Sequence, residues 1–317
     1  MYARGLSMSE PSEQRSQPTE EQIVAMISLL GDDRGPLQES AHARLLAWGE
    51  QVAEQLRAGA EAEHMQTRTR CRALLRAIEV RGAIERVGAL RLDRMGEAAA
   101  PVLLDGAVLA ARMVRTFVPE SRALASKLRR EAATLRSACV GRSLPVCARL
   151  LSERLHERIG LRGCDPSLLD VEHRLLVADV FSSSGANRGL LDRMLIDRVL
   201  AEGEGAPVAL SLIYLLVARW AGLSATGVAL PDHFLIRLHG PRPLLIDPFH
   251  GGRVVTKSDC VRYLRSNGYQ RPRNHLRDLN DREVLLRYFE SLSAASRLAA
   301  PSAHDALSAA VERLQLR

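Results

Sequence analysis

Apolar residues recur every three or four positions along the first half of the chain, from about residue 19 to residue 160. The segments "ARLLAWGEQVAEQL", "RALLRAI" and "SKLRREAATLRSACV" show this spacing and contain few β-branched runs. The period is typical of amphipathic α-helices that pack one face into a core. We therefore predict an α-helical domain over residues 19–160. A disordered lead, residues 1–18, precedes it and is rich in Ser, Glu, Gln and Pro.

Two of these helical segments resemble each other. They align at one constant offset, which is close to the period of paired-helix solenoid repeats, and the second copy resembles the helix–turn element of HEAT repeats. Chance similarity between two amphipathic helices explains two copies about as well. The matched residues are Trp48, Gly49, Glu50, Ala53 and Leu56 with Met95, Gly96, Glu97, Ala100 and Leu103.

The pattern changes near residue 160. The stretch "GEGAPVALSLIYLLVARWAGL", residues 203–223, opens with a glycine-rich loop that we expect to be exposed and continues as an almost wholly apolar helix. Pro207 suits the first helical position, where its missing N–H costs nothing, and Gly222 stands where a helix C-cap glycine belongs. The segments "SATGVAL", "HFLIRL", "PLLIDP" and "RVVT" then predict short antiparallel strands.

Helical spacing flanks this region on both sides. Ser167 is a plausible N-cap for a helix in "SLLDVEHRLLVADVFS", and Asn280 or Asp281 caps the first helix of the last segment. The predicted fold class is α+β: a helical domain, a mixed core over residues 161–270 and a helical C-terminal tail over residues 271–317.

Composition narrows the class of protein. The chain has 317 residues, enough for two domains, and no apolar run approaches the ~18 to 20 residues of a membrane span. No signal-peptide core is present near the start, so we expect a cytoplasmic protein with no membrane partner. The net charge is +7, but the basic residues are interleaved with acids and lack neighbouring aromatics, so we expect no nucleic-acid partner.

Cysteine usage also excludes some chemistry. The five cysteines are scattered and form no C-x-x-C pair, which favours reduced thiols over a disulfide framework or a zinc site. From the sequence we expect no metal and no cofactor.

The start of the apolar helix suits an anion or a thiolate, because backbone donors and the positive end of the helix dipole face outward there. In cysteine transferases and proteases the nucleophile occupies this place, and a His and an orienting carboxylate come from adjacent strands. His233 begins one predicted strand and Asp247 ends the next. If Leu238 faces Leu244 across the turn, the pair lies on one face as diagonal neighbours, roughly 7 to 8 Å apart at the backbone. A one-residue shift in register would separate them.

The order of these segments, from "LLDRMLIDRVL" through "PDHFLIRL" to "LLIDPFHGGRVV", resembles the SirB-type family of bacterial transglutaminase-like domain proteins over about residues 165 to 265. The resemblance implies a fold similar to papain-like transglutaminases. It assigns His233 and Asp247 to a Cys-His-Asp triad and places Pro207 at the nucleophile position, as in many members of the family. Asp232 replaces the usual small residue before the His, and a second carboxylate there would raise the pKa of the imidazole.

Structural interpretations stand beside these functional ones. The His233–Asp247 pair can simply fix a hairpin, and the hydroxyl of Ser211 more often bonds a carbonyl than a catalytic His. We expect Tyr214 to be a packing residue and Arg219 a surface residue. The segment "PFHGG" predicts a tight turn in which Gly251 and Gly252 are free to adopt positive φ and His250 is exposed.

Two classes of function remain open. The preferred one is a non-catalytic transglutaminase-like module joined to the helical domain, a binding or regulatory protein with a protein or peptide partner. The alternative is a hydrolase or acyl-transfer enzyme that uses His233 and Asp247 with an activated water or with a thiol from elsewhere. Cys164 and Cys260 are the only reasonable substitutes for that thiol, and neither begins a helix after a glycine-rich loop.

Overall fold

The computed structural model describes residues 17–32, 34–93, 96–169, 189–231, 233–270 and 272–316. The chain forms two compact units, Met1–Glu79 and Val80–Arg317. The predicted disordered lead, apart from residues 17 and 18, lies outside the described residues. The predicted domain limits at residues 160 and 270 stay predictions.

The first unit is helical, as predicted. Its first helix begins at a capping box, in which Thr19 accepts from the backbone of Gln22 and the Gln22 side chain accepts from Thr19. Apolar residues from all of its helices share one small core, which includes Leu30, Leu45 and Leu56. The elements are α1 Glu20–Leu30, α2 Gly35–Trp48, η1 Gly49–Val52, α3 Ala53–Gly59 and the first part of α4 Met65–Ala89.

The two similar sequence segments adopt the same local structure. Gly49 and Gly96 have positive φ angles, 62° and 63°. Each opens a four-residue 3-10 helix that leads directly into an α-helix, η1 into α3 and η2 (Gly96–Ala99) into α5 (Ala100–Val114). The sequence match therefore reflects a shared turn and helix start, and a HEAT-type repeat stays a prediction.

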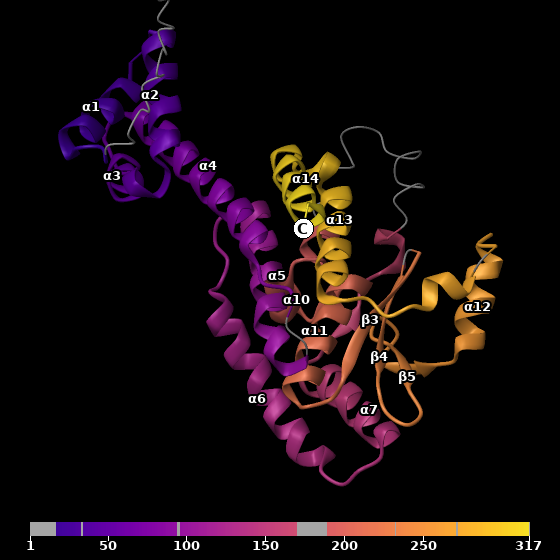
Figure 1. Cartoon of the computed structure of the whole chain (residues 1–317). Coiled ribbons are helices and arrows are strands. Elements are labelled where there is room, and N and C mark those ends of the chain that lie inside the picture. Colours follow the sequence, from indigo (N-terminus) through magenta and orange to yellow (C-terminus); the bar gives the residue numbers. More distant parts are fainter. Residues whose placement is uncertain are drawn as a thin grey trace, which may run out of the picture. The chain divides into compact units, whose positions relative to one another are not determined.

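The second unit holds the sheet and most of the helices (Figure 1). After α5 its elements are α6 Ser121–Cys139, α7 Leu144–Glu153, the π-helical segment η3 Arg154–Arg158, β1 Arg162–Gly163, η4 Pro166–Leu168, α10 Ile196–Glu202, β2 Glu204–Gly205, α11 Pro207–Trp220, β3 Ala225–Leu230, β4 His233–Leu238, β5 Leu244–Asp247, β6 Arg253–Val255, α12 Lys257–Ser266, η5 Pro272–Leu276, α13 Asp281–Ala299 and α14 Pro301–Gln315. Within the described residues, no helix is both long and apolar enough to cross a membrane.

Helix α11 is the centre of the second unit. Every one of its 14 residues is buried. A helix that is apolar on all sides is stable only when it is surrounded by other elements. It begins at Pro207, as predicted, and contacts α5, α6, α13 and strands β3 and β4. After its end Gly222 has a φ of 83°, and the N–H of Leu223 donates to the carbonyl of Ala218. This confirms the predicted C-cap glycine.

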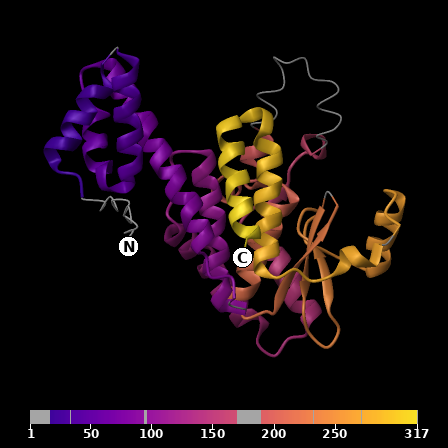
Figure 2. The same ribbon diagram turned by 45° about the horizontal axis from the view of Figure 1, so that its top comes forward.

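The four strands form an antiparallel sheet in the order β3-β4-β5-β6, and Leu238 pairs with Leu244, the register on which the expected contact of His233 with Asp247 depended. Phe234, Ile236 and Ile246 belong to the core that contains α11. Leu235 and Leu245 belong to a separate cluster with Cys260 and Leu264 of α12. The sheet thus lies between the two helices (Figures 1 and 2), and the predicted α+β fold is confirmed.

The glycine-rich loop before α11 is not exposed, and that prediction was wrong. Glu204 and Gly205 form strand β2, which pairs in parallel with β1. Gly205 is buried, and a Cβ atom there would lie 2.9 Å from the side chains of Leu210 and Val199. The glycine is needed for this close approach of the backbone to α10 and α11.

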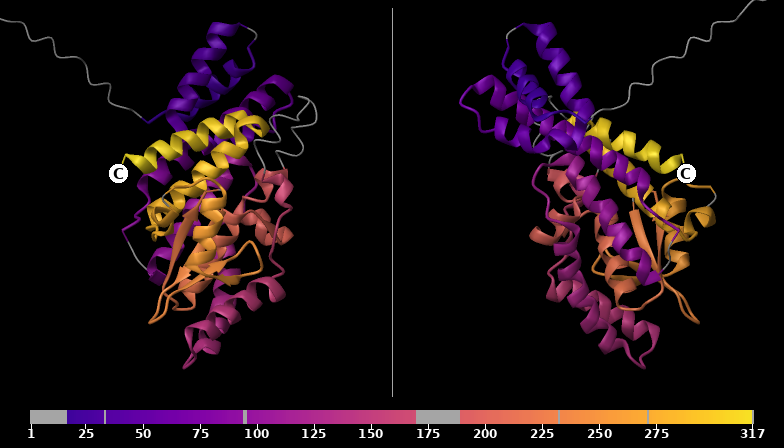
Figure 3. Two further views of the ribbon diagram at one scale, coloured as in Figure 1. Left: turned by 90° about the vertical axis from the view of Figure 1, so that its right-hand side faces the viewer. Right: turned by 60° about the vertical axis from the view of Figure 1, so that its left-hand side comes forward.

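Of the predicted helix caps outside α11, one was wrong and one is confirmed. Asp165, not Ser167, caps η4 by accepting from the Ser167 N–H; the helix predicted after it lies largely outside the described residues. Asn280 caps α13 in a capping box with Glu283, as predicted. Helices α13 and α14 pack side by side, at the opposite end of this unit from the loop that joins α6 to α7 (Figure 3).

Candidate functional site

His233 and Asp247 contact each other directly. His233 Nε2 lies 3.0 Å from Asp247 Oδ1, and the side chains are 14% and 3% exposed. Pairing of Leu238 with Leu244 brings the start of β4 beside the end of β5. The predicted proximity is confirmed, while the catalytic role of the two residues stays a prediction.

A second histidine binds the same carboxylate, and this contact was not predicted from the sequence. His250 Nδ1 lies 2.8 Å from Asp247 Oδ2, and the His250 backbone N–H donates to Oδ1. The ring is exposed as predicted, but the turn bends it back onto Asp247, because Gly251 and Gly252 adopt φ angles of 74° and 70°. Arg253 also reaches Oδ2, at 3.4 Å. A His three residues after an Asp, directly before two glycines, was the signal for this contact.

The carboxyl group of Asp247 is held in its charged form. Burial alone would raise its pKa, but hydrogen bonds and charge from His233, and then from His250, outweigh that effect and lower the pKa to about 2. Asp247 is therefore a carboxylate throughout the neutral range, and it orients two imidazole rings.

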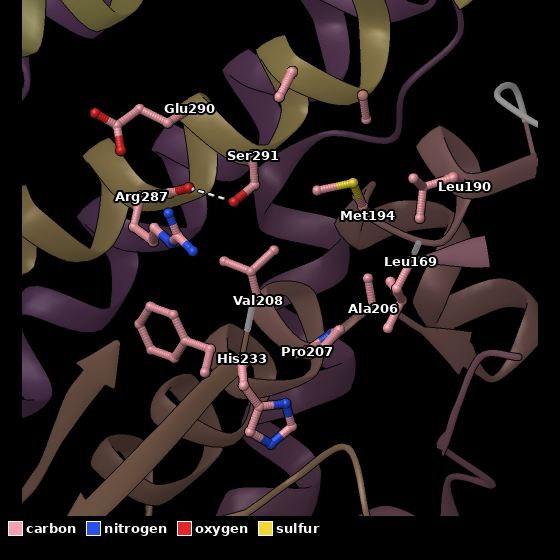
Figure 4. A pocket seen from close by; sticks show the side chains of 13 residues that line it. Leu169, Leu190, Met194, Ala206, Pro207, Val208, His233, Arg287, Glu290 and Ser291 are labelled. Atoms are coloured by element: carbon pink, nitrogen blue, oxygen red, sulfur yellow. Dashed lines mark hydrogen bonds between the residues drawn. The ribbon is translucent and has the colours of Figure 1, made fainter. Parts of the chain in front are cut away.

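A cavity of about 400 Å³ opens where α11 begins (Figure 4). Its walls are mostly apolar, and its polar groups are His233, Arg287, Glu290 and Ser291. Figure 4 shows Arg287 and Ser291 pointing from α13 toward the start of α11, whereas Glu290 points away. Ser291 donates to the carbonyl of Arg287 at 2.8 Å.

The start of α11 forms one wall of this cavity through Ala206, Pro207 and Val208. Among the described residues no side chain caps the helix, and the N–H of Leu210 donates the first backbone bond to the carbonyl of Ala206. The N–H groups of the first turn and the positive end of the helix dipole are thus beside the cavity. In Figure 4 one nitrogen of the His233 ring lies on the side of Pro207; it is Nδ1, since Nε2 faces Asp247.

Other residues of α11 are structural. Ser211 is buried and donates to the carbonyl of Phe234 at 2.9 Å, so its hydroxyl is engaged with β4 and not with His233. Tyr214 is a packing residue, as predicted. Arg219 is not a surface residue: its side chain is 4% exposed and pairs with Asp281 at 2.7 Å. That partner lies far along the chain, so no local pattern indicated it.

The two candidate thiols are buried. Burial raises the pKa of Cys164 to about 11 and also raises the pKa of Cys260. Among the described residues that line the cavity, none is a cysteine. A neutral, buried thiol is a poor nucleophile, so neither residue offers a reactive thiol to this cavity. Asp232, expected to influence His233, lies outside the described residues.

Comparison with known proteins gives one family match. Residues 123–290, more than half of the chain, match the family described as the transglutaminase-like superfamily. Two proteins of Xylella fastidiosa, each described as a "UPF0162 protein", are 41% identical to this chain, over 71 residues in strain 9a5c and 61 residues in strain Temecula1. These matches cover 22% and 19% of this chain and 25% and 22% of the relatives. The chain thus spans about a quarter of the length of these relatives. No solved structure matches.

Proposed function

We propose that this chain, which belongs to the transglutaminase-like superfamily, is a non-catalytic member of the SirB-type group and acts as a binding or regulatory protein in the cytoplasm. The observation that carries the proposal is Pro207 at the cavity wall beside His233. By resemblance this is the position of the nucleophilic cysteine, and proline has no group that can attack a carbonyl. Loss of a nucleophile typically removes several orders of magnitude in rate.

The cavity keeps the means to bind a ligand. The first turn of α11 offers backbone donors, and His233 Nδ1 lies on the same side. Arg287 adds a guanidinium group, and within the described part of the chain no carboxylate is paired with it. These groups suit a carboxylate or a side-chain amide, while the apolar walls suit the hydrocarbon part of the same ligand. The partner is therefore a protein or peptide segment that presents such a group.

The test uses a defined probe, N-benzyloxycarbonyl-glutaminyl-glycine, which has an aromatic group, a side-chain amide and a carboxylate. Calorimetry should detect binding, and hydroxylamine should yield no hydroxamate. Arg287→Ala should weaken binding about tenfold, because a hydrogen-bonded charge is lost. Arg297→Ala removes an exposed arginine from the same helix and should leave binding unchanged. Absence of binding, or equal losses in the two variants, would refute the cavity as the binding site.

One observation favours a second candidate, a hydrolase that uses an activated water. His233 is held by Asp247 at 3.0 Å with its other nitrogen toward Pro207, which is the arrangement that a general base requires. Ammonia released from the same probe, and lost in His233→Ala, would support this candidate and contradict the non-catalytic one.

A further inference from the structure

We propose that His233, Asp247 and His250 form a binding site for a divalent metal ion, and that Zn²⁺ is the ion it fits best. One possible ligand atom from each residue lies within 4.8 Å of the other two. The residues come from the start of β4, the end of β5 and the turn that follows β5. This site goes beyond the proposed peptide binding, and it revises the expectation of no metal, which rested on the cysteines alone.

The two histidine-to-carboxylate distances need little adjustment to accept zinc, and the third separation is within 4.8 Å. His233 Nε2 and His250 Nδ1 now lie 3.0 and 2.8 Å from the oxygens of Asp247. Ligand atoms of a tetrahedral zinc ion, with bonds of about 2.0 to 2.2 Å, lie roughly 3.3 to 3.6 Å apart. Two imidazoles and one carboxylate form the ligand set of an open zinc site, in which water or a ligand takes the fourth position.

Burial and access are both suitable. Asp247 is 3% exposed, so its position is fixed by the protein, whereas His250 is 48% exposed and leaves a path to solvent. A single histidine would be enough to engage Asp247 as a triad partner, yet two converge on it from different elements. Arg253 faces the same carboxylate with a side chain that is 62% exposed, so it is free to move away when a cation arrives.

The metal would also fix which nitrogen of the His233 ring carries a proton. Zinc bound at Nε2 requires the ring to carry its proton on Nδ1, the nitrogen on the side of Pro207. His233 would then be a permanent hydrogen-bond donor to the cavity and could not accept a proton there. A metal-bound state is thus suited to binding a carboxylate or amide, and unsuited to general-base catalysis.

The experiment uses the full chain without a polyhistidine tag, stripped with a chelator and titrated with ZnCl₂ in a calorimeter. Visible absorption of added Co²⁺ gives an independent readout. We expect one equivalent of Zn²⁺ to bind, and His250→Asn to lower the affinity more than about tenfold. The Asn amide nitrogen can still donate to Asp247, so this variant preserves the fold while removing a ligand. His64→Asn, an exposed histidine of the first unit, is the matched control and should change nothing.

A second variant, Arg253→Ala, is expected to raise the zinc affinity and not to lower it. It removes a positive charge that lies 3.4 Å from the ligand carboxylate, so it should tighten zinc binding several-fold. Three results would overturn the metal site: no zinc binding, binding that His250→Asn leaves intact, or weaker binding in Arg253→Ala. The zinc titration contains no peptide probe, and the peptide assay can be run in chelator. Failure of this inference is therefore distinct from failure of the proposed function.

Discussion

Arg219, in the last turn of α11, and Asp281, the first residue of α13, form a buried two-pronged ion pair. The two nitrogen-to-oxygen distances are 2.9 and 2.7 Å, and the side chains are 4% and 8% exposed. Arg219 Nε also donates to the carbonyl of Ala225 at 3.1 Å. One guanidinium group thus joins α11, the first residue of β3 and the start of α13. Helix α13 also carries Arg287, which lines the cavity.

Asp281→Ala should destabilise the second unit by about 3 to 5 kcal/mol, because the charge of Arg219 would remain buried without its partner. Denaturant unfolding in a Trp48→Phe background, in which Trp220 of α11 is the remaining tryptophan, measures the change by fluorescence. Glu85→Ala breaks an exposed pair with Arg81 in α4 and should cost less than about 0.5 kcal/mol. Similar losses in both variants would contradict the structural role given to the buried pair.

The two glycines after His250 should respond differently to substitution. Both have positive φ, but a Cβ on Gly252 would lie 2.2 Å from Ser152 Oγ and Tyr214 Oη, whereas no atom of the described residues lies within 4 Å of one on Gly251. Gly251→Ala should cost about 1 to 2 kcal/mol from backbone conformation alone. Gly252→Ala should cost an additional 1 to 3 kcal/mol from overpacking. Thermal unfolding compares them, and equal shifts in midpoint would show that the turn relaxes freely.

Local sequence patterns predicted most of what positions the pair at the site. The segments "HFLIRL" and "LLID" predicted two antiparallel strands, and the contact between His233 and Asp247 was expected on the condition that Leu238 faces Leu244, a register that depends on the turn. The register then brought His233 to Asp247. The proline and the glycine at the two ends of the apolar stretch marked the limits of α11, because both act through backbone geometry alone.

Contacts between distant segments were not predictable in this way. From its own helix Arg219 was predicted to be a surface residue. Its charge can be buried because Asp281, from a distant segment, pairs with it. The two-residue strand at Gly205 has no periodicity to detect, since its role depends on β1 and on the side chain of Leu210. His250 was predicted as exposed, which is correct, but the direction of its ring depends on two consecutive positive φ angles.

The stabilising effect of Asp247 should depend on pH with a definite sign. Its pKa is lowered from 3.8 to about 2 in the folded protein, so its contribution, about 2 kcal/mol, is fully present above the unfolded value. It is lost as the pH falls from about 4 to about 2, because the carboxyl group of Asp247 then takes up a proton and loses the charge that its partners stabilise. The stability gap between the wild type and Asp247→Asn should therefore narrow over this range.

Chemical denaturation at a series of pH values measures that gap. Asp305→Asn removes an exposed carboxylate from α14 and serves as the control. A gap for Asp247→Asn that stays constant down to pH 2 would mean that the two histidines and Arg253 do not stabilise the carboxylate in the folded protein.

The nucleophile position can be examined by restoring a thiol. A cysteine in Pro207→Cys would stand at the uncapped start of α11, beside the ring of His233, and both the helix dipole and an imidazolium ion favour a thiolate. We expect its pKa to fall below the free value of about 8.5 and to rise again in Pro207→Cys/His233→Ala. Alkylation rate against pH, measured in chelator, gives both values. The native Cys164 and Cys260 do not interfere, since burial raises their pKa values.

A new thiol that titrates near 8.5 in both variants would mean that His233 and Asp247 stabilise the hairpin and keep no alignment toward the helix start. A depressed value that depends on His233 would mean that the site retains triad geometry and lacks only its nucleophile.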